Sequence, residues 1–132
     1  MAYKKRNDSY GKGGEIMTKE SFFNYCFDVH GTEPDYPFEK DLETAVFRHK
    51  KNRKWFAICM RVPEKKFGIL GDRVVDVVNL KIAPEIRDSF SPADGVYPAY
   101  HMSKTKWISI ILERAEDSTV CFLTDVSFKL TK

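Results

Sequence analysis

The segment 48–55, Arg-His-Lys-Lys-Asn-Arg-Lys-Trp, holds five cations within seven residues: Arg48, Lys50, Lys51, Arg53 and Lys54. The stretches on either side of it have the apolar composition of strands. Because a turn between strands projects from a sheet, its side chains can reach a partner that the sheet cannot touch. Arginine binds phosphate with two parallel hydrogen bonds, and lysine binds it as a mobile point charge. The turn is therefore a candidate site for an anion such as nucleic acid. The alternative is a solvated turn whose lysines discourage strand pairing.

Two other segments carry residue types that suit a nucleic acid. Lys65 and Lys66 lie in a turn with two glycines and form a second projecting loop, although neighbouring acidic residues partly cancel their charge. The segment 98–107 places Lys104, Lys106 and Trp107 among aromatic residues, and aromatic rings stack on bases while cations meet phosphate. The alternative for 98–107 is an ordered loop that closes one end of the core, with Trp107 half-buried.

The charge of the chain is local rather than general. The formal net charge is +3 over 132 residues, yet segment 48–54 contains five cations and no acidic residue. The protein therefore has a basic spot and not a basic surface, which favours a local anion site over long-range steering.

Patterns typical of enzymes and metal sites are absent from the sequence. The histidines His30, His49 and His101 lie in different segments without metal-ligand spacing, and neither a phosphate loop nor a dinucleotide fingerprint occurs. The three cysteines are irregularly spaced within apolar patterns, which predicts reduced core residues. We expect no catalytic residue, metal or cofactor, and we interpret the acidic group at Glu113, Glu116 and Asp117 as helix capping.

The compartment is inferred from what the chain lacks. No apolar run approaches the roughly 20 residues that span a bilayer, and no apolar signal region is present at the N-terminus. We expect a cytoplasmic, monomeric protein.

The order of elements predicts how these residues are positioned. Thr18 is a suitable N-cap for a helix that Gly31 ends, and a second helix starts at Asp117 or Ser118. Strands are expected at about 43–49, 54–62, 73–82 and 106–113, with a short helix starting at Pro84. This order is typical of an α+β fold, an antiparallel sheet of four to five strands with helices packed on one face. The other face is expected to be open and to carry Trp107, with Trp55 as a second candidate.

The first sixteen residues have almost no apolar periodicity. We interpret 1–16 as a mobile arm or a mis-annotated start, and 17–132 as a single domain. The second possibility rests on the Lys-Gly-Gly-Glu-Ile that precedes Met17, which is what translation of a ribosome-binding site and its spacer produces.

Several separated motifs occur in an order known from one family. They are VVNLKIAPE, GVYPAYHMSKTKWISIIL, the terminal SFKL and the preceding YPFEKDLETAVFRHKKNRKWFAIC. Over residues 17–132 the chain resembles the MmcQ/YjbR family of small bacterial proteins. The resemblance implies a fold similar to CyaY and frataxin-like proteins, and a role in binding double-stranded DNA through a double wing. Phe128 stands where the family pattern leads us to expect tyrosine, and the turn before Trp55 is more basic than usual.

Two functions are consistent with these observations. The first is a non-enzymatic DNA-binding protein that grips duplex phosphates mainly through the five cations of 48–54, with Lys65, Lys66, Lys104 and Lys106 auxiliary and Trp107 in contact. The second is a protein-interaction module of a regulatory pathway that uses the open sheet face and has no nucleic-acid role.

Overall fold

Helix α1 (Lys19–His30) begins and ends at the residues that the sequence indicates. The structure, a computed structural model, describes residues 10–132. The Thr18 hydroxyl accepts a hydrogen bond from the Ser21 N–H, and Gly31 adopts a left-handed conformation with φ 63° that lets its N–H bond the last carbonyls. Both predicted caps are confirmed.

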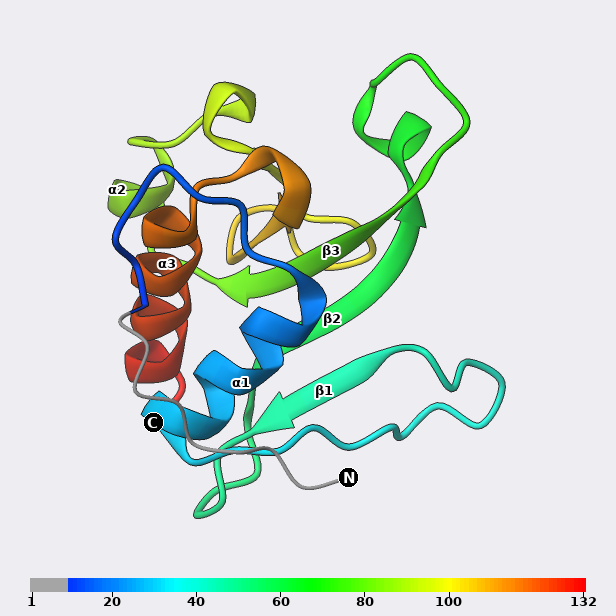
Figure 1. The fold of residues 1–132 in the computed structure, drawn as a ribbon. Helices are drawn as coiled ribbons and strands as arrows, with labels where there is room; N and C mark the ends of the chain where they lie inside the picture. Colours follow the sequence, from blue (N-terminus) through cyan, green and yellow to red (C-terminus); the bar gives the residue numbers. More distant parts are fainter. Residues whose placement is uncertain (1–9) are drawn as a thin grey trace.

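The sheet has five antiparallel strands in the order β1-β2-β3-β5-β4 (Figure 1). The strands are β1 (Ala45–Arg48), β2 (Trp55–Pro63), β3 (Val74–Lys81), β4 (Val96–Pro98) and β5 (Trp107–Ile111). The α+β class is confirmed, and so is the expected sheet of four to five strands. Four of the strands fall within the predicted segments, whereas β4 lies in a segment that we expected to be a loop.

The helices α1 and α3 (Asp117–Leu130) cover one face of the sheet (Figure 1). The core between them contains Phe22, Phe47 and Phe56, each fully buried. The rings of Phe22 and Phe47 meet edge to face at 5.6 Å between centroids, a preferred geometry for aromatic pairs. The short α2 (Pro84–Arg87) begins at the predicted proline. No helix within residues 10–132 is both long and apolar enough to cross a bilayer.

One serine attaches α3 to the two central strands. The buried Ser127 hydroxyl donates to the Phe56 carbonyl at 2.5 Å and accepts from the Lys81 N–H at 2.9 Å. Phe56 lies where the register between β1 and β2 shifts, so its carbonyl is bonded by the helix. Ser127 therefore satisfies a donor on β3 and a fully buried acceptor on β2.

The described part of the N-terminal segment is docked on the helices. The Gly13 N–H donates to the Asp117 carboxylate at 2.8 Å, and the Asp117 N–H donates to the Glu15 carbonyl at 2.8 Å. Asp117 lies in the first turn of α3, as the capping interpretation expects, whereas the N-cap residue Glu116 makes no side-chain cap bond to the helix. Its carboxylate accepts from Gly14 instead, at 3.4 Å. Segment 10–16 brings backbone N–H groups to the start of α3, and the carboxylates of Glu116 and Asp117 accept hydrogen bonds from them. Residues 1–9 of the expected arm lie outside the described residues.

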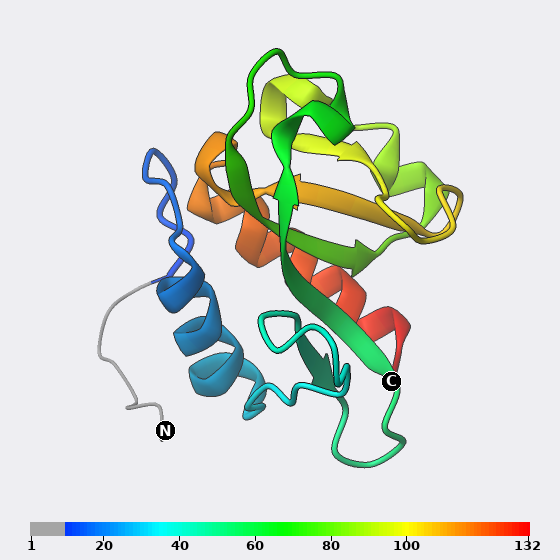
Figure 2. The same cartoon turned by 90° about the vertical axis from the view of Figure 1, so that its right-hand side faces the viewer.

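The face of the sheet away from the helices is less open than expected. Figure 2 looks onto this face, where the segment joining β2 and β3 curls over the sheet. Phe67 of that segment packs on Tyr97 at 5.3 Å and on Tyr100 at 6.1 Å between ring centroids. Beneath them, the fully buried Asn79 and Ser109 hydrogen-bond to each other and to the backbone of Tyr100. Loop 99–106 is thereby fixed against the face, as the closing-loop alternative anticipated.

Both outer strands have partners or blocks at their free edges. Asp35 exchanges two backbone hydrogen bonds with Val46 of β1, each at 2.9 Å. At the opposite edge, β4 is three residues long and ends in Pro98, which has no N–H to donate.

Replacing Ser127 with alanine tests the attachment of α3. Ser127→Ala leaves the buried Phe56 carbonyl and the Lys81 N–H without their partner, so we expect the free energy of unfolding to fall by about 2–4 kcal/mol. Urea denaturation followed by circular dichroism measures this loss. The matched control is Ser89→Ala, whose serine is exposed; the control should lose less than about 0.5 kcal/mol. Equal effects of the two substitutions would contradict the assignment.

Candidate nucleic-acid interface

The turn between β1 and β2 is a closed loop stabilised by its own backbone. The His49 N–H donates to the Lys54 carbonyl at 2.9 Å, and the Arg53 N–H donates to the His49 carbonyl at 3.0 Å. The Asn52 side chain accepts from the Lys54 N–H at 2.9 Å. Arg53 has φ 64°, a left-handed conformation that is uncommon for a residue other than glycine. The side chains of the turn are consequently presented from a defined backbone.

The end of α3 anchors this turn. The buried His49 ring meets the Thr131 hydroxyl at 2.7 Å, and the Asn52 amide donates to the Thr131 carbonyl at 3.0 Å. Phe128, one turn earlier in α3, packs against His49 with 4.2 Å between ring centroids. A turn held by a histidine, an amide and an aromatic contact does not swing freely.

Two of the five predicted cations are engaged by one carboxylate. Asp35 accepts from Arg48 Nε at 2.9 Å, and Arg53 Nη2 lies 3.5 Å from the same oxygen. The Arg48 guanidinium also lies over the Trp55 ring, 5.4 Å from its centroid. Asp35 comes from a segment that reads as a connector, and its bridge to Val46 brings it alongside β1. Arg48 and Arg53 are therefore partly neutralised, which the sequence did not indicate.

Lys50, Lys51 and Lys54 differ from these arginines. All three are exposed, and no carboxylate within residues 10–132 lies within ion-pair distance of them. With respect to residues 10–132, their ammonium groups are available to a ligand.

The start of β5 lies at the same end of the sheet as the turn. Arg48 of β1 is the cross-strand partner of Trp55, and Lys81 of β3 is the partner of Trp107. The Lys106 carbonyl accepts from the Ile82 N–H at 2.9 Å, so Lys106 is fixed beside the end of β3. The structure thus brings the basic turn, Lys106 and Trp107 to one end of the sheet. It also places Lys81 there, which our sequence analysis did not select.

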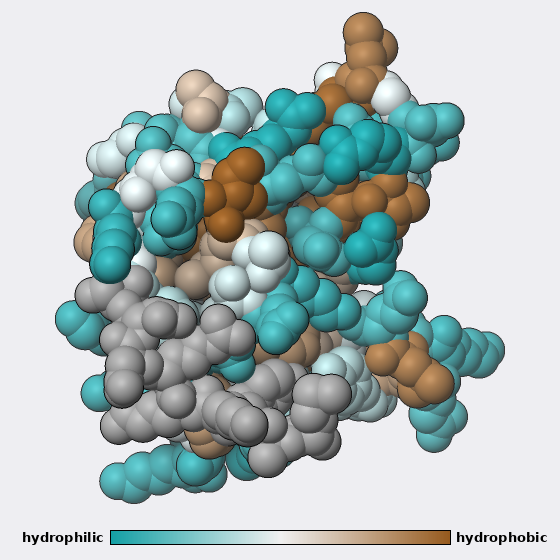
Figure 3. Space-filling view, viewed as in Figure 1, coloured by the Kyte–Doolittle hydropathy of each residue, from teal (hydrophilic) through white to brown (hydrophobic). Residues whose placement is uncertain are grey.

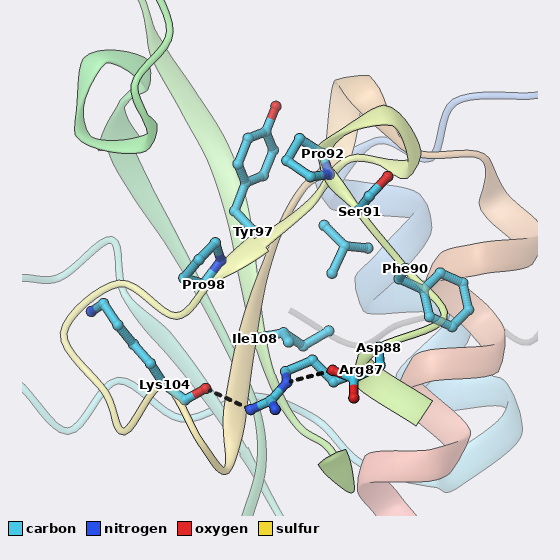
Figure 4. A pocket seen from close by; sticks show the side chains of 10 residues that line it. Arg87, Asp88, Phe90, Ser91, Pro92, Tyr97, Pro98, Lys104 and Ile108 are labelled. Atoms are coloured by element: carbon cyan, nitrogen blue, oxygen red, sulfur yellow. Dashed lines mark hydrogen bonds and ion pairs between the residues drawn. The ribbon is translucent and has the colours of Figure 1, made fainter. Parts of the chain in front are cut away.

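A pocket lies at the base of loop 99–106 (Figure 4). The pocket holds about 550 Å³ between the segment containing α2 and the strands β4 and β5. Arg87 on its wall donates to the carbonyls of Lys104 and Thr105 at 3.1 and 3.2 Å. The Lys104 amine, drawn pointing away from Ile108 in Figure 4, donates to the Ala99 carbonyl at 2.9 Å. These two cations therefore hold the loop in place, and Lys104 contributes its charge to the interface without being free.

Lys65 and Lys66 lie on the segment between β2 and β3, at the end of the sheet opposite the basic turn. Both are exposed in a short 3-10 turn (Glu64–Phe67). Because the segment curls over the sheet, Lys66 shares a hollow of about 270 Å³ with Lys104 and His101. The predicted second wing exists as a projecting segment, but it is not adjacent to the first.

Burial is the main cause of the pKa shifts of the buried cysteines. Burial raises the pKa of the Cys26 thiol well above its usual range and raises those of Cys59 and Cys121 to about 12. The prediction of reduced core cysteines is confirmed, since all three are free and buried. Within residues 10–132, no three metal-binding side chains converge on one point.

The chain is similar to proteins from several bacteria. The family model described as YjbR matches residues 28–130. YyaQ, an uncharacterised protein of Bacillus subtilis, is 41% identical over 118 residues, which are 89% of this chain and 100% of YyaQ. The crystal structure of a Pseudomonas syringae protein superposes with a TM-score of 0.83 at 42% identity, covering 88% of this chain and 100% of that one.

A more distant structure supports the fold alone. The crystal structure of a Deinococcus radiodurans protein superposes with a TM-score of 0.64 at 22% identity, covering 87% of this chain and 78% of that protein.

The anchor of the turn predicts a dependence of stability on pH. Burial lowers the pKa of His30 and of His49 below the usual 6.5, against a smaller opposing effect of Asp125 on His30. The folded protein then binds fewer protons than the unfolded chain as the pH falls through 6.5. We expect the free energy of unfolding to be greatest above this pH and to decline towards pH 5, measured by urea denaturation at each pH. His49→Gln should flatten the decline, whereas replacement of the exposed His101 with glutamine should not. An unchanged slope in His49→Gln would contradict this origin.

Proposed function

This chain belongs to the YjbR family, and we propose that it binds nucleic acid, duplex DNA first, through phosphate contacts at the end of the sheet that carries turn 49–54. The observation that supports the proposal most strongly is the exposure of Lys50, Lys51 and Lys54 on a turn that α3 holds in place. A charge cluster that only solubilises the surface has no need of an anchored backbone. A phosphate-binding turn gains from one, because less conformational entropy is lost on binding.

The proposed mechanism is electrostatic. Each lysine that meets a phosphate releases condensed counterions, which changes the slope of log K against log salt by about −0.9 for duplex DNA. Three unpaired lysines correspond to a slope of about −3. Lys106 and the partly neutralised arginines add to this value where the duplex reaches them.

Sequence-specific reading of bases is not part of the proposal. A recognition helix presents a polar and basic face to the major groove. In this protein α1 and α3 use one side to cover the sheet, and the cations of the interface lie on a turn and at strand ends. Contacts of this kind position a protein on the backbone without distinguishing sequences.

A second candidate function is a protein-interaction module, and one observation favours it. Leu70 is 98% exposed on the segment joining β2 and β3, and Leu42 is 73% exposed on the segment before β1. Figure 3 shows the hydrophobic end of the β2–β3 segment standing out at the upper right. A protein partner that covers these two side chains would remove their apolar surface from water.

Removing the unpaired lysines tests the DNA proposal. We expect the Lys50→Ala, Lys51→Ala, Lys54→Ala triple variant to lower the magnitude of the salt slope by about 2–3, because three counterion-releasing contacts are lost. Fluorescence anisotropy of a labelled duplex at several salt concentrations measures the slope. Lys12→Ala, on the N-terminal segment at the other end of α3, is the control and should leave it unchanged. An unaltered slope in the triple variant would favour the protein-interaction candidate.

Removing the charge that neutralises Arg48 and Arg53 should strengthen DNA binding, the opposite of removing the lysines. Asp35→Asn keeps the size of the side chain and its backbone bridge to Val46 but removes the charge that neutralises Arg48 and Arg53. We expect tighter binding to duplex DNA and a salt slope steeper by about 1–2, measured in the same assay. Asp76→Asn, which removes a comparable carboxylate 3.1 Å from Arg61 on the central strands, is the matched control. Weaker binding by Asp35→Asn would show that the ion pair itself forms the binding surface.

A further inference from the structure

Four side chains form a row across the end of the sheet, on the face away from the helices. They are Arg48, Trp55, Lys81 and Trp107, from β1, β2, β3 and β5. Alternation places Arg48, Lys81 and Trp107 on this face, and the register shift at Phe56 brings Trp55 opposite Arg48 on the same face. Trp107 has the parity of Ile111 and Lys81 that of Val77, both of which belong to the cluster on that face. The row alternates cation and indole and contains both tryptophans of the chain. Three strand spacings separate its ends, roughly 14 Å.

The first indole of the row is already occupied. The Arg48 guanidinium lies over the Trp55 ring, and Phe38 meets the same indole edge-on at 6.0 Å. Asp35 holds Arg48 in this position. Trp55 is therefore part of the packing that joins β1 to the segment before it.

The second indole has no such cover. Trp107 is half-buried, and no aromatic ring or cation within residues 10–132 lies over it. The backbone at Trp107 is nevertheless fixed, because the main-chain N–H of Trp107 donates to the Ser103 carbonyl at 2.9 Å and Arg87 holds the preceding loop. Lys81 stands opposite it on β3, and the exposed Lys106 precedes it.

An uncovered indole with a lysine opposite it on the neighbouring strand, and a second lysine next to it in the chain, has the chemistry that binds an unpaired nucleotide. A base stacks on the aromatic ring, and the phosphates on its two sides meet the cations. A paired base is already stacked within the duplex, so it cannot occupy the ring without leaving the helix. We infer that Trp107 is a stacking platform for an unpaired base, so that a duplex with an unpaired nucleotide at this end of the sheet binds more tightly than a continuous duplex. This inference rests on the proposed phosphate contacts.

The two tryptophans allow a direct test. Trp55→Phe leaves Trp107 as the sole indole, and its fluorescence is titrated with a short oligothymidylate and with an abasic strand of equal length. We expect the thymidine strand to quench the indole and the abasic strand to bind more weakly without quenching. Trp107→Leu should bind the thymidine strand about 5- to 150-fold more weakly, while Trp107→Phe, which keeps a ring, should lose much less. Thermal melting verifies that each variant is folded.

Each outcome separates the two proposals. Equal affinity of the unsubstituted protein for the thymidine and abasic strands, with salt-sensitive binding of both, would overturn the stacking platform and leave the phosphate contacts standing. This comparison needs no variant, so it holds even if Trp107→Leu does not fold. Absence of salt-sensitive binding to thymidine, abasic and duplex DNA alike would overturn the proposed function itself.

Discussion

The last two turns of α3 determine where the basic turn and the end of β3 lie. Ser127 bonds a carbonyl of β2 and an N–H of β3, and Thr131, one turn later, receives the His49 ring and the Asn52 amide of the basic turn. One short stretch of helix therefore fixes the start of β2, the end of β3 and the turn between β1 and β2. The terminal motif Ser-Phe-Lys-Leu, which appears from sequence to be only the end of an amphipathic helix, is the part of the molecule to which that end of the sheet is attached.

The charge of the interface is smaller than its composition suggests. The Asp35 carboxylate pairs with Arg48 and Arg53, and the Lys104 amine donates a hydrogen bond to a backbone carbonyl. These ion pairs and this hydrogen bond restrict the movement of the cations that make them. The exposed lysines of the turn, which have no such contact within residues 10–132, can exchange water for phosphate. The same surface thus has two classes of cation. One class builds the site, and the other is available for binding.

Local signals in the sequence predicted most of the fold. Thr18 and Gly31 delimit α1 because their capping bonds form within three to five residues, and four strands follow from alternation and β-branched composition. The strand β4 was missed because three residues ending in proline are too few to show an alternating pattern. The neutralisation of Arg48 was missed because Asp35 lies 13 residues away and reaches it through a tertiary bridge.

The anchoring of the turn was beyond sequence reasoning for the same reason, since Asn52 and Thr131 are 79 residues apart. Lys81 could have been selected from the sequence, because alternation along β3 places it with Val77 on the face away from the helices.

The two edges of the sheet limit how this protein can associate with itself. A row of unpaired N–H and carbonyl groups at a sheet margin is a template for another chain, and continuous templates lead to stacked, fibrous assemblies. Here Asp35 has already taken the bonding positions of Val46 on one margin, and Pro98 interrupts the other. A second copy finds no uninterrupted ladder to extend, so growth by strand addition is obstructed at both ends while the basic turn stays uncovered.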